Sequence, residues 1–128
     1  MKTRKPQPTD GELLILNVLW RRGPSTVRRV HEELAPERDT GYTTTLKLLQ
    51  IMNEKGLVRR DTSERSHVYE AACGEVAVKR GVVGDLLDRV FEGSARQLVM
   101  QALEAGKVSA DELRQIRRLI ERKERGRR

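Results

Sequence analysis

Apolar positions in the first 55 residues recur every three or four residues, the spacing of an α-helix that buries one face. The pattern covers residues 10–22, 25–34 and 42–55. Gly23-Pro24 interrupts it first, and a polar stretch around Pro36 interrupts it again. The chain is therefore expected to begin with three short helices, preceded by a loose basic arm over residues 1–8.

Local signals mark the ends of these helices. "TDGE" has the form of a capping box, in which the Thr9 hydroxyl accepts from the third helical amide and Glu12 reaches back to Thr9. Ser25 is expected to cap the second helix, and Gly56 to end the third. The buried face of the first helix is expected to carry Leu13, Leu16, Leu19 and Trp20.

After the third helix the apolar period changes to that of a strand. Leu57 and Val58 precede polar residues, "DTSERS" supplies a turn, and Val68 and Tyr69 resume the apolar signal. This pattern predicts a β-hairpin. Three helices and a hairpin make a winged helix-turn-helix, in which helices two and three form the turn motif and the hairpin forms the wing.

From Glu75 onward only helical periodicity remains, over about 75–91, 94–105 and 110–125, with Ser94 and the "SADE" box at Ser109 as starts. With Phe91 as their single aromatic, these helices cannot easily bury their own apolar stripes, which favours a dimer. The expected dimer contacts are Val82, Leu86, Val90, Leu98, Leu103, Leu113, Ile116, Leu119 and Ile120. The predicted fold is mainly α: a winged helix-turn-helix (1–73) followed by a three-helix dimerisation region (74–128).

Charge narrows the classes of function. The net charge is +7 and the pI about 10.1, as in many proteins that neutralise nucleic-acid phosphates, although a soluble protein with an arginine bias would also fit. The single cysteine, Cys73, excludes an intramolecular disulfide and is expected to be a small core residue. No apolar run is long enough to span a bilayer, so we expect no signal peptide, no membrane insertion and a cytoplasmic location.

The third helix presents two chemically different faces when its residues are spaced at about 100°. Thr45, Leu48, Leu49 and Met52 share the inward face, with Tyr42 at its edge. The outward face carries Thr43, Thr44, Lys47, Gln50 and Ile51. Lysine and glutamine can donate to base edges, and threonine methyls can contact thymine, so this face is predicted to read a DNA major groove. Alternatively, Thr43 and Thr44 only cap the helix.

The predicted wing is basic. Arg59, Arg60, Arg65 and His67, with Lys55 beside them, are expected to contact backbone phosphates, although a solvated hairpin would carry similar charges. Neither His67 nor His31 has a cysteine or carboxylate at ligand spacing. We therefore expect ordinary histidines, no metal site and no cofactor.

The segments "ILNVLWRRGPSTVRRVHEEL", "GYTTTLKLLQIMNEKGLVRR", "SHVYEA" and "LVMQALEAGKVSADELRQIRRLIE" occur in this order over about residues 9–123. In this order and spacing they resemble the penicillinase-repressor family of transcriptional regulators (BlaI/MecI/CopY). The resemblance implies a homodimeric repressor that binds a palindromic double-stranded DNA operator through its winged domain. Loss of dimerisation would release it.

The resemblance also bears on the inducing signal. In β-lactam-responsive members a membrane sensor-protease system triggers cleavage at an Asn-Phe bond in the penultimate helix, where this chain has Gln101-Ala102. The copper-responsive branch has a cysteine-rich tail, whereas this chain ends in "ERKERGRR". The resemblance therefore implies Gln101 and Ala102 as the residues of a possible cleavage site, with a bond that differs from the family's Asn-Phe, and excludes copper sensing through a cysteine-rich tail.

Two other classes of function fit the sequence less well than a repressor. A winged-helix RNA-binding or protein-docking module would need exposed aromatics for base stacking, but the few aromatics fall in predicted core or strand positions. An enzyme would need a catalytic constellation, and no Ser-His-Asp, Cys-His or phosphate-loop pattern is present. The sequence favours a DNA-binding protein that is not an enzyme.

Overall fold

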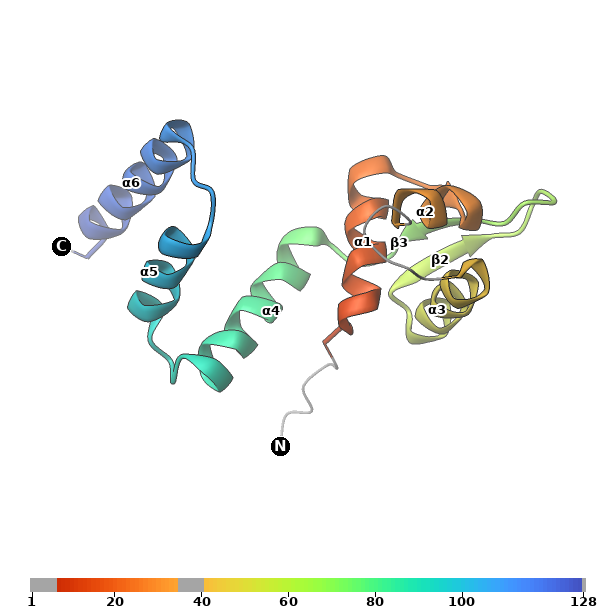
Figure 1. The fold of residues 1–128 in the computed structure, drawn as a ribbon, viewed down its shortest axis with the longest axis horizontal. Helices are drawn as coiled ribbons and strands as arrows, with labels where there is room; N and C mark the ends of the chain where they lie inside the picture. Colours follow the sequence, from red (N-terminus) through yellow and green to blue (C-terminus); the bar gives the residue numbers. More distant parts are fainter. Residues whose placement is uncertain (1–6, 35–40, 128) are drawn as a thin grey trace. The chain divides into compact units, whose positions relative to one another are not determined.

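The computed structural model describes residues 7–34 and 41–127. Most of the expected basic arm and the break around Pro36 lie outside these residues. The elements are α1 (Asp10–Arg22), β1 (Ser25–Thr26), α2 (Val27–Leu34), α3 (Tyr42–Lys55), β2 (Val58–Asp61), β3 (Val68–Ala71), α4 (Glu75–Val90), α5 (Ala95–Ala105) and α6 (Ala110–Arg125) (Figure 1). The predicted class, mainly α with a winged helix-turn-helix, is confirmed.

Helix α1 begins and ends at the predicted signals. The amide of Glu12 donates to the Thr9 hydroxyl at 3.2 Å, and the amide of Thr9 donates to the Glu12 carboxylate at 2.9 Å. This reciprocal pair satisfies two amides that the helix itself cannot. At the other end Gly23 takes a φ of 82°, which a glycine adopts without a steric cost.

The prediction that Ser25 caps α2 is wrong. Thr26 accepts the amide of Arg29 at 3.2 Å, while the Ser25 hydroxyl donates to the carbonyl of Gly23 at 2.9 Å. Ser25 and Thr26 form the short strand β1, which pairs antiparallel with β3. The sheet therefore has three strands in the order β1-β3-β2, because β1 satisfies backbone groups on the side of β3 that the hairpin leaves free.

The Thr26 cap is open to a direct test. Thr26→Ala should lower the free energy of unfolding by about 1 kcal/mol in urea melts, because the Arg29 amide loses its acceptor. Thr26→Ser keeps the hydroxyl and should recover most of that loss. Equal losses in both variants would mean that packing, and not the cap, stabilises this corner.

The core of the winged domain lies between the three helices and the sheet. Helix α1 packs on α2, α3 and β3 together, so a wide face of it is buried. Leu13 and Trp20, expected inside, are only half-buried, whereas Ile15 and Val18 are buried. The buried apolar residues are Ile15, Leu16, Val18, Leu19, Val27, Val30, Leu34, Leu49, Met52, Val58 and Tyr69.

The chain divides into two compact units, one through Val83 and one from Gly84. This division falls inside α4, and the predicted domain boundary at 73/74 stays a prediction. Helices α5 and α6 start where expected, with Ser94 accepting from the Gln97 amide and Ser109 from the Glu112 amide, both at 3.1 Å. No residue of α4, α5 or α6 is buried. The described part of the chain contains no helix long and apolar enough to cross a bilayer.

Candidate nucleic-acid interface

Helix α3 exposes most of the side that the sequence assigns to base reading. Thr43, Thr44, Lys47 and Gln50 are exposed, and Ile51 is half-buried. On the opposite side Thr45, Leu49 and Met52 are buried, as expected, whereas Leu48, also expected inward, is half-buried. The outward face is thus a polar surface backed by the core.

Thr43 and Thr44 do not cap α3. The N-cap is Gly41, and no side chain makes a capping hydrogen bond there. Within the described residues the Thr43 and Thr44 hydroxyls make no hydrogen bond to the protein. These hydroxyls remain available to an outside acceptor, and helix N-termini favour anions.

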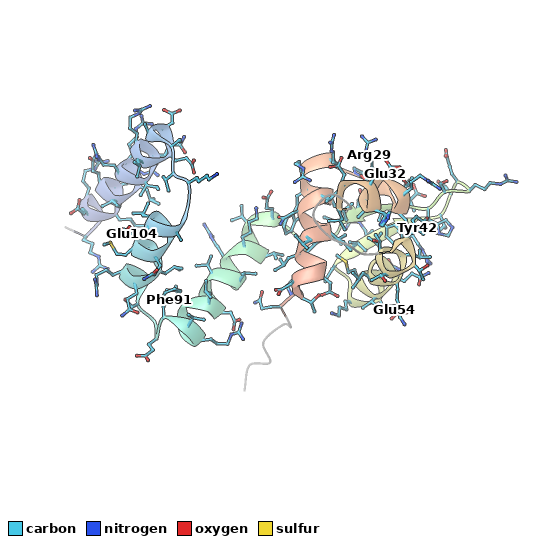
Figure 2. The ribbon with its side chains drawn as sticks, in the orientation of Figure 1. Arg29, Glu32, Tyr42, Glu54, Phe91 and Glu104 are labelled. Carbon is cyan, nitrogen blue, oxygen red and sulfur yellow. The ribbon has the colours of Figure 1, made fainter. Side chains whose placement is uncertain are left out.

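The beginning of α3 is fixed against α2. The hydroxyl of Thr45, fully buried, lies 3.2 Å from Nδ1 of His31. The rings of His31 and Tyr42 meet edge to face with centroids 5.8 Å apart, and Figure 2 shows Tyr42 beside α2. These contacts orient the first turn of α3.

The end of α3 is fixed against α1 by an ion pair that the sequence did not predict. Nζ of Lys55 donates to both oxygens of Glu12, at 3.1 and 2.8 Å. Burial raises the pKa of Glu12, but the hydrogen bonds from Lys55 and Thr9 and the Lys55 charge outweigh it, so the pKa lies below 4.5. In this structure the Lys55 ammonium is thus held by Glu12, and its expected contact with phosphate stays a prediction.

The wing presents the expected cations, with one already paired. Nε of Arg59 donates to the Glu70 carboxylate at 3.1 Å across the β2–β3 register, an exposed pair of the kind that contributes little stability. Arg60, Arg65 and His67 are exposed and make no ion pair within the described residues. His67 lies just before β3.

The turn of the wing starts at Asp61. The amide of Ser63 donates to Oδ1 of Asp61 at 2.9 Å and thereby lowers the pKa of that carboxyl. The Asp61 side chain and the Ser63 amide therefore organise the start of this turn.

The connection from β3 to α4 is tied to the winged domain. Nε1 of Trp20 donates to the carbonyl of Cys73 at 3.1 Å, and Nζ of Lys79 lies 5.7 Å from the Trp20 ring centroid. The thiol of Cys73 donates to the carbonyl of Leu57 at 3.5 Å, and burial raises its pKa. Cys73, expected in the core, is half-buried and packs against the core, and its raised pKa gives no sign of activation.

The predicted dimer contacts are incompletely covered in one chain. Val90, Leu113, Leu119 and Ile120 are 44–59% exposed, and Val82, Leu86, Leu98, Leu103 and Ile116 are half-buried. Val99 and Met100 of α5 are exposed too, although the sequence prediction did not include them. Helical periodicity could have found both, because they lie beside Leu98 and Leu103.

Metal-binding groups do not gather anywhere in residues 7–34 and 41–127: no cluster of three His, Cys, Asp or Glu side chains could hold an ion.

An exposed polar helix and a basic wing therefore characterise the winged domain. The family model described as penicillinase repressor matches residues 8–122. The chain belongs to the penicillinase repressor family. This confirms the resemblance drawn from the sequence segments.

Individual relatives agree with the family assignment. The transcriptional regulator BlaI of Mycobacterium tuberculosis is 34% identical over 118 residues, covering 91% of this chain and 85% of the relative. The penicillinase repressor of Bacillus licheniformis is 23% identical over 116 residues, covering 91% of each chain. A solution structure of the DNA binding domain of the repressor BlaI matches with a TM-score of 0.50 and 24% identity, over 58% of this chain and 90% of that domain. That match shows the winged-helix fold.

Proposed function

We propose that this penicillinase-repressor family protein represses transcription as a homodimer that binds a palindromic DNA operator. Its family membership makes it a DNA-binding transcriptional repressor. The single observation that carries the finer proposal is the outward face of α3, where Thr43, Thr44, Lys47 and Gln50 stand exposed on a helix anchored at both ends.

The proposed base contacts follow from the chemistry of this face. Lys47 donates to guanine O6 or N7, Gln50 pairs with adenine, and the methyl groups of Thr43, Thr44 and Ile51 contact thymine. The recognition helix must hold its position for such contacts to discriminate bases. The Glu12–Lys55 pair and the His31–Thr45 contact supply that rigidity.

The wing adds affinity for DNA that does not depend on the base sequence. Arg60, Arg65 and His67 are free to meet phosphates beside the groove, and Arg59 joins them by exchanging an exposed carboxylate for a phosphate. Such contacts position the helix and make binding depend on salt.

The dimer follows from the apolar side chains that a single chain leaves in water. Burying apolar surface contributes about 25 cal/mol per Å², so the stripes of α4, α5 and α6 favour association with a second copy. Two recognition helices related by a two-fold axis would then enter major grooves about 10 base pairs apart.

Release follows from loss of dimerisation. Gln101 and Ala102, at the position of the family's cleaved bond, are exposed in α5. A cut there, by a membrane sensor-protease system, would separate α6 from the rest of the chain. The proposal places the protein in the cytoplasm with the chromosome and gives it no catalytic role.

Two substitutions separate base reading from phosphate binding. Lys47→Ala should weaken binding to the operator by about 1–3 kcal/mol and relax its base preference, because the lysine no longer donates to a base in the groove. Arg60→Ala should weaken operator and random duplexes alike and reduce the salt slope by about 1, because one phosphate is no longer neutralised. Fluorescence anisotropy with both duplexes at several salt concentrations measures each effect.

The same assay decides against the proposal if the two variants behave alike. Equal losses on operator and random DNA for Lys47→Ala would mean that the outward face of α3 does not read bases. Tighter binding to an RNA of the operator's sequence than to the DNA duplex would favour the RNA-binding alternative instead.

A further inference from the structure

Helix α6 carries a second basic surface, far along the chain from the wing. Residues 113–127 contain seven basic and two acidic side chains. At about 100° per residue, Arg114, Arg118, Arg122 and Arg125 fall within an arc of about 80°. We call these four residues the arginine stripe.

The arginine stripe lies opposite the apolar residues of the same helix. Leu113, Ile116, Leu119 and Ile120 centre about 180° away from it around the helix axis. If the apolar residues are covered by a second copy, as in the proposed dimer, the arginines stay in water. The inference therefore rests on the proposed function.

Most arginines of the stripe are not neutralised by an acidic side chain of the protein itself. Arg114 pairs with Asp111, but Arg118, Arg122 and Arg125 make no ion pair within the described residues, and all are exposed. Cations in the last turn stabilise a helix through its dipole, which accounts for Arg122 and Arg125. Arg118 lies two turns before the end of α6, beyond the reach of that effect.

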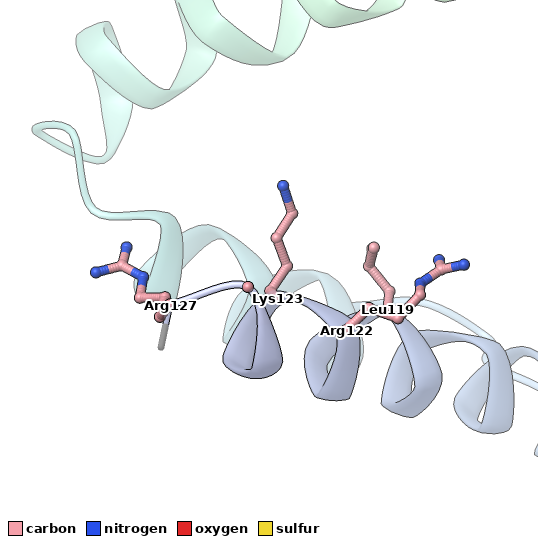
Figure 3. Close-up of a pocket in the computed structure, with 5 residues that line it drawn as sticks. Leu119, Arg122, Lys123 and Arg127 are labelled. Carbon is pink, nitrogen blue, oxygen red and sulfur yellow. The ribbon is translucent and has the colours of Figure 1, made fainter.

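Arg122, at the end of the stripe, also lines an open hollow of about 560 Å³ together with Leu119, Lys123, Gly126 and Arg127. Figure 3 shows the long side chains of Arg122, Lys123 and Arg127 extending from this end of α6. These three side chains add positive charge at this end of α6, and arginine's planar fork suits a phosphate in particular.

We propose that the arginine stripe binds the phosphate backbone of duplex DNA outside the bases read by α3. The stripe runs for about 16 Å, and duplex DNA carries one charge per about 1.7 Å of its axis, so every arginine can meet a phosphate. The protein is already held on DNA by its winged domain, which makes phosphate the polyanion at the highest local concentration. The stripe adds affinity that does not depend on sequence.

The test uses the full-length protein and a random-sequence duplex of about 40 base pairs. The stripe variant Arg118→Gln/Arg122→Gln/Arg125→Gln should reduce the salt slope by about 0.9 for each phosphate that is no longer neutralised. At about 0.1 M salt its affinity should fall by on the order of 10-fold to 100-fold. The control variant Arg96→Gln/Lys107→Gln/Arg117→Gln removes the same charge from other exposed positions and should stay within about twofold of the wild type.

Each other outcome has a defined meaning. Equal losses in the two variants would make net charge, not the stripe, responsible and would overturn the inference. A stripe variant that sediments as a monomer would assign the arginines to the dimer contact, which also overturns it. Wild-type protein that binds no duplex contradicts the proposed function itself. Binding that Arg60→Ala weakens and the stripe variant leaves unchanged contradicts the stripe alone.

Discussion

Leu113→Asp is expected to convert the protein into a monomer and to weaken operator binding by on the order of 10²-fold or more. Leu113 is 44% exposed on α6, in line with Ile116 and Ile120. A carboxylate there would have to be desolvated in the interface without a partner, which costs far more than a leucine in the same place. The operator is then bound by two independent monomers of low affinity in place of one bivalent dimer. Sedimentation equilibrium and anisotropy measure the two effects.

A matched control variant distinguishes disruption of the dimer interface from the general effect of an added negative charge. Gln97→Asp adds the same carboxylate to the polar side of α5, where it should leave the dimer intact. Leu86→Asp in α4 should reproduce the effect of Leu113→Asp, and circular dichroism should show that the helices persist in each variant. Dimers that survive both leucine substitutions would contradict the proposed interface.

Lys55→Met is expected to destabilise the winged domain by about 2 kcal/mol at pH 7. The substitution keeps the packing of the lysine stem but leaves the Glu12 carboxylate, 2% exposed, without its cation. Breaking a buried pair costs about 3–5 kcal/mol, and the partial exposure of Lys55 reduces that figure because water reaches the site. Lys47→Met, on the exposed face of the same helix, should change the unfolding free energy by less than about 0.5 kcal/mol.

The pH dependence of the two proteins should have opposite signs. In the wild type the pKa of Glu12 is below 4.5, so its contribution is full above that pH and is lost as the pH falls through the folded value. In Lys55→Met burial dominates and raises that pKa, so acid should relieve the unpaired charge. Urea melts between about pH 7 and pH 4 should show the gap between the proteins closing. A gap independent of pH would mean that the Glu12–Lys55 pair does not stabilise the fold through its charges.

Local signals explain which parts of the fold could be predicted. The boundaries of α1 and α3 matched because a capping box, Gly23 and Gly56 specify helix ends within a few residues. Strand β1 could not be predicted, because two residues carry no alternation and its pairing depends on Tyr69 and Val68, distant in sequence. The cap of α2 was misassigned because α2 begins at Val27, so that Thr26 and not Ser25 occupies the cap position.

In the candidate site, too, features set by the local sequence could be predicted, and contacts between distant residues could not. Helical spacing alone predicts which side of α3 is exposed, and the exposure of Thr43, Thr44 and Lys47 agrees with it. The pairing of Glu12 with Lys55, 43 residues apart, depends on how α1 and α3 pack, so no local pattern contains it. Arg59 likewise meets Glu70 only through the register of the hairpin.

A genome-wide footprint of the bound protein reports the sequence and the symmetry of its DNA sites together. The account predicts an inverted repeat whose two half-sites are centred about 10 base pairs apart, with protection in the major groove of each half. A single asymmetric site, or protection without any shared sequence, would contradict a dimer that reads DNA with the outward face of α3.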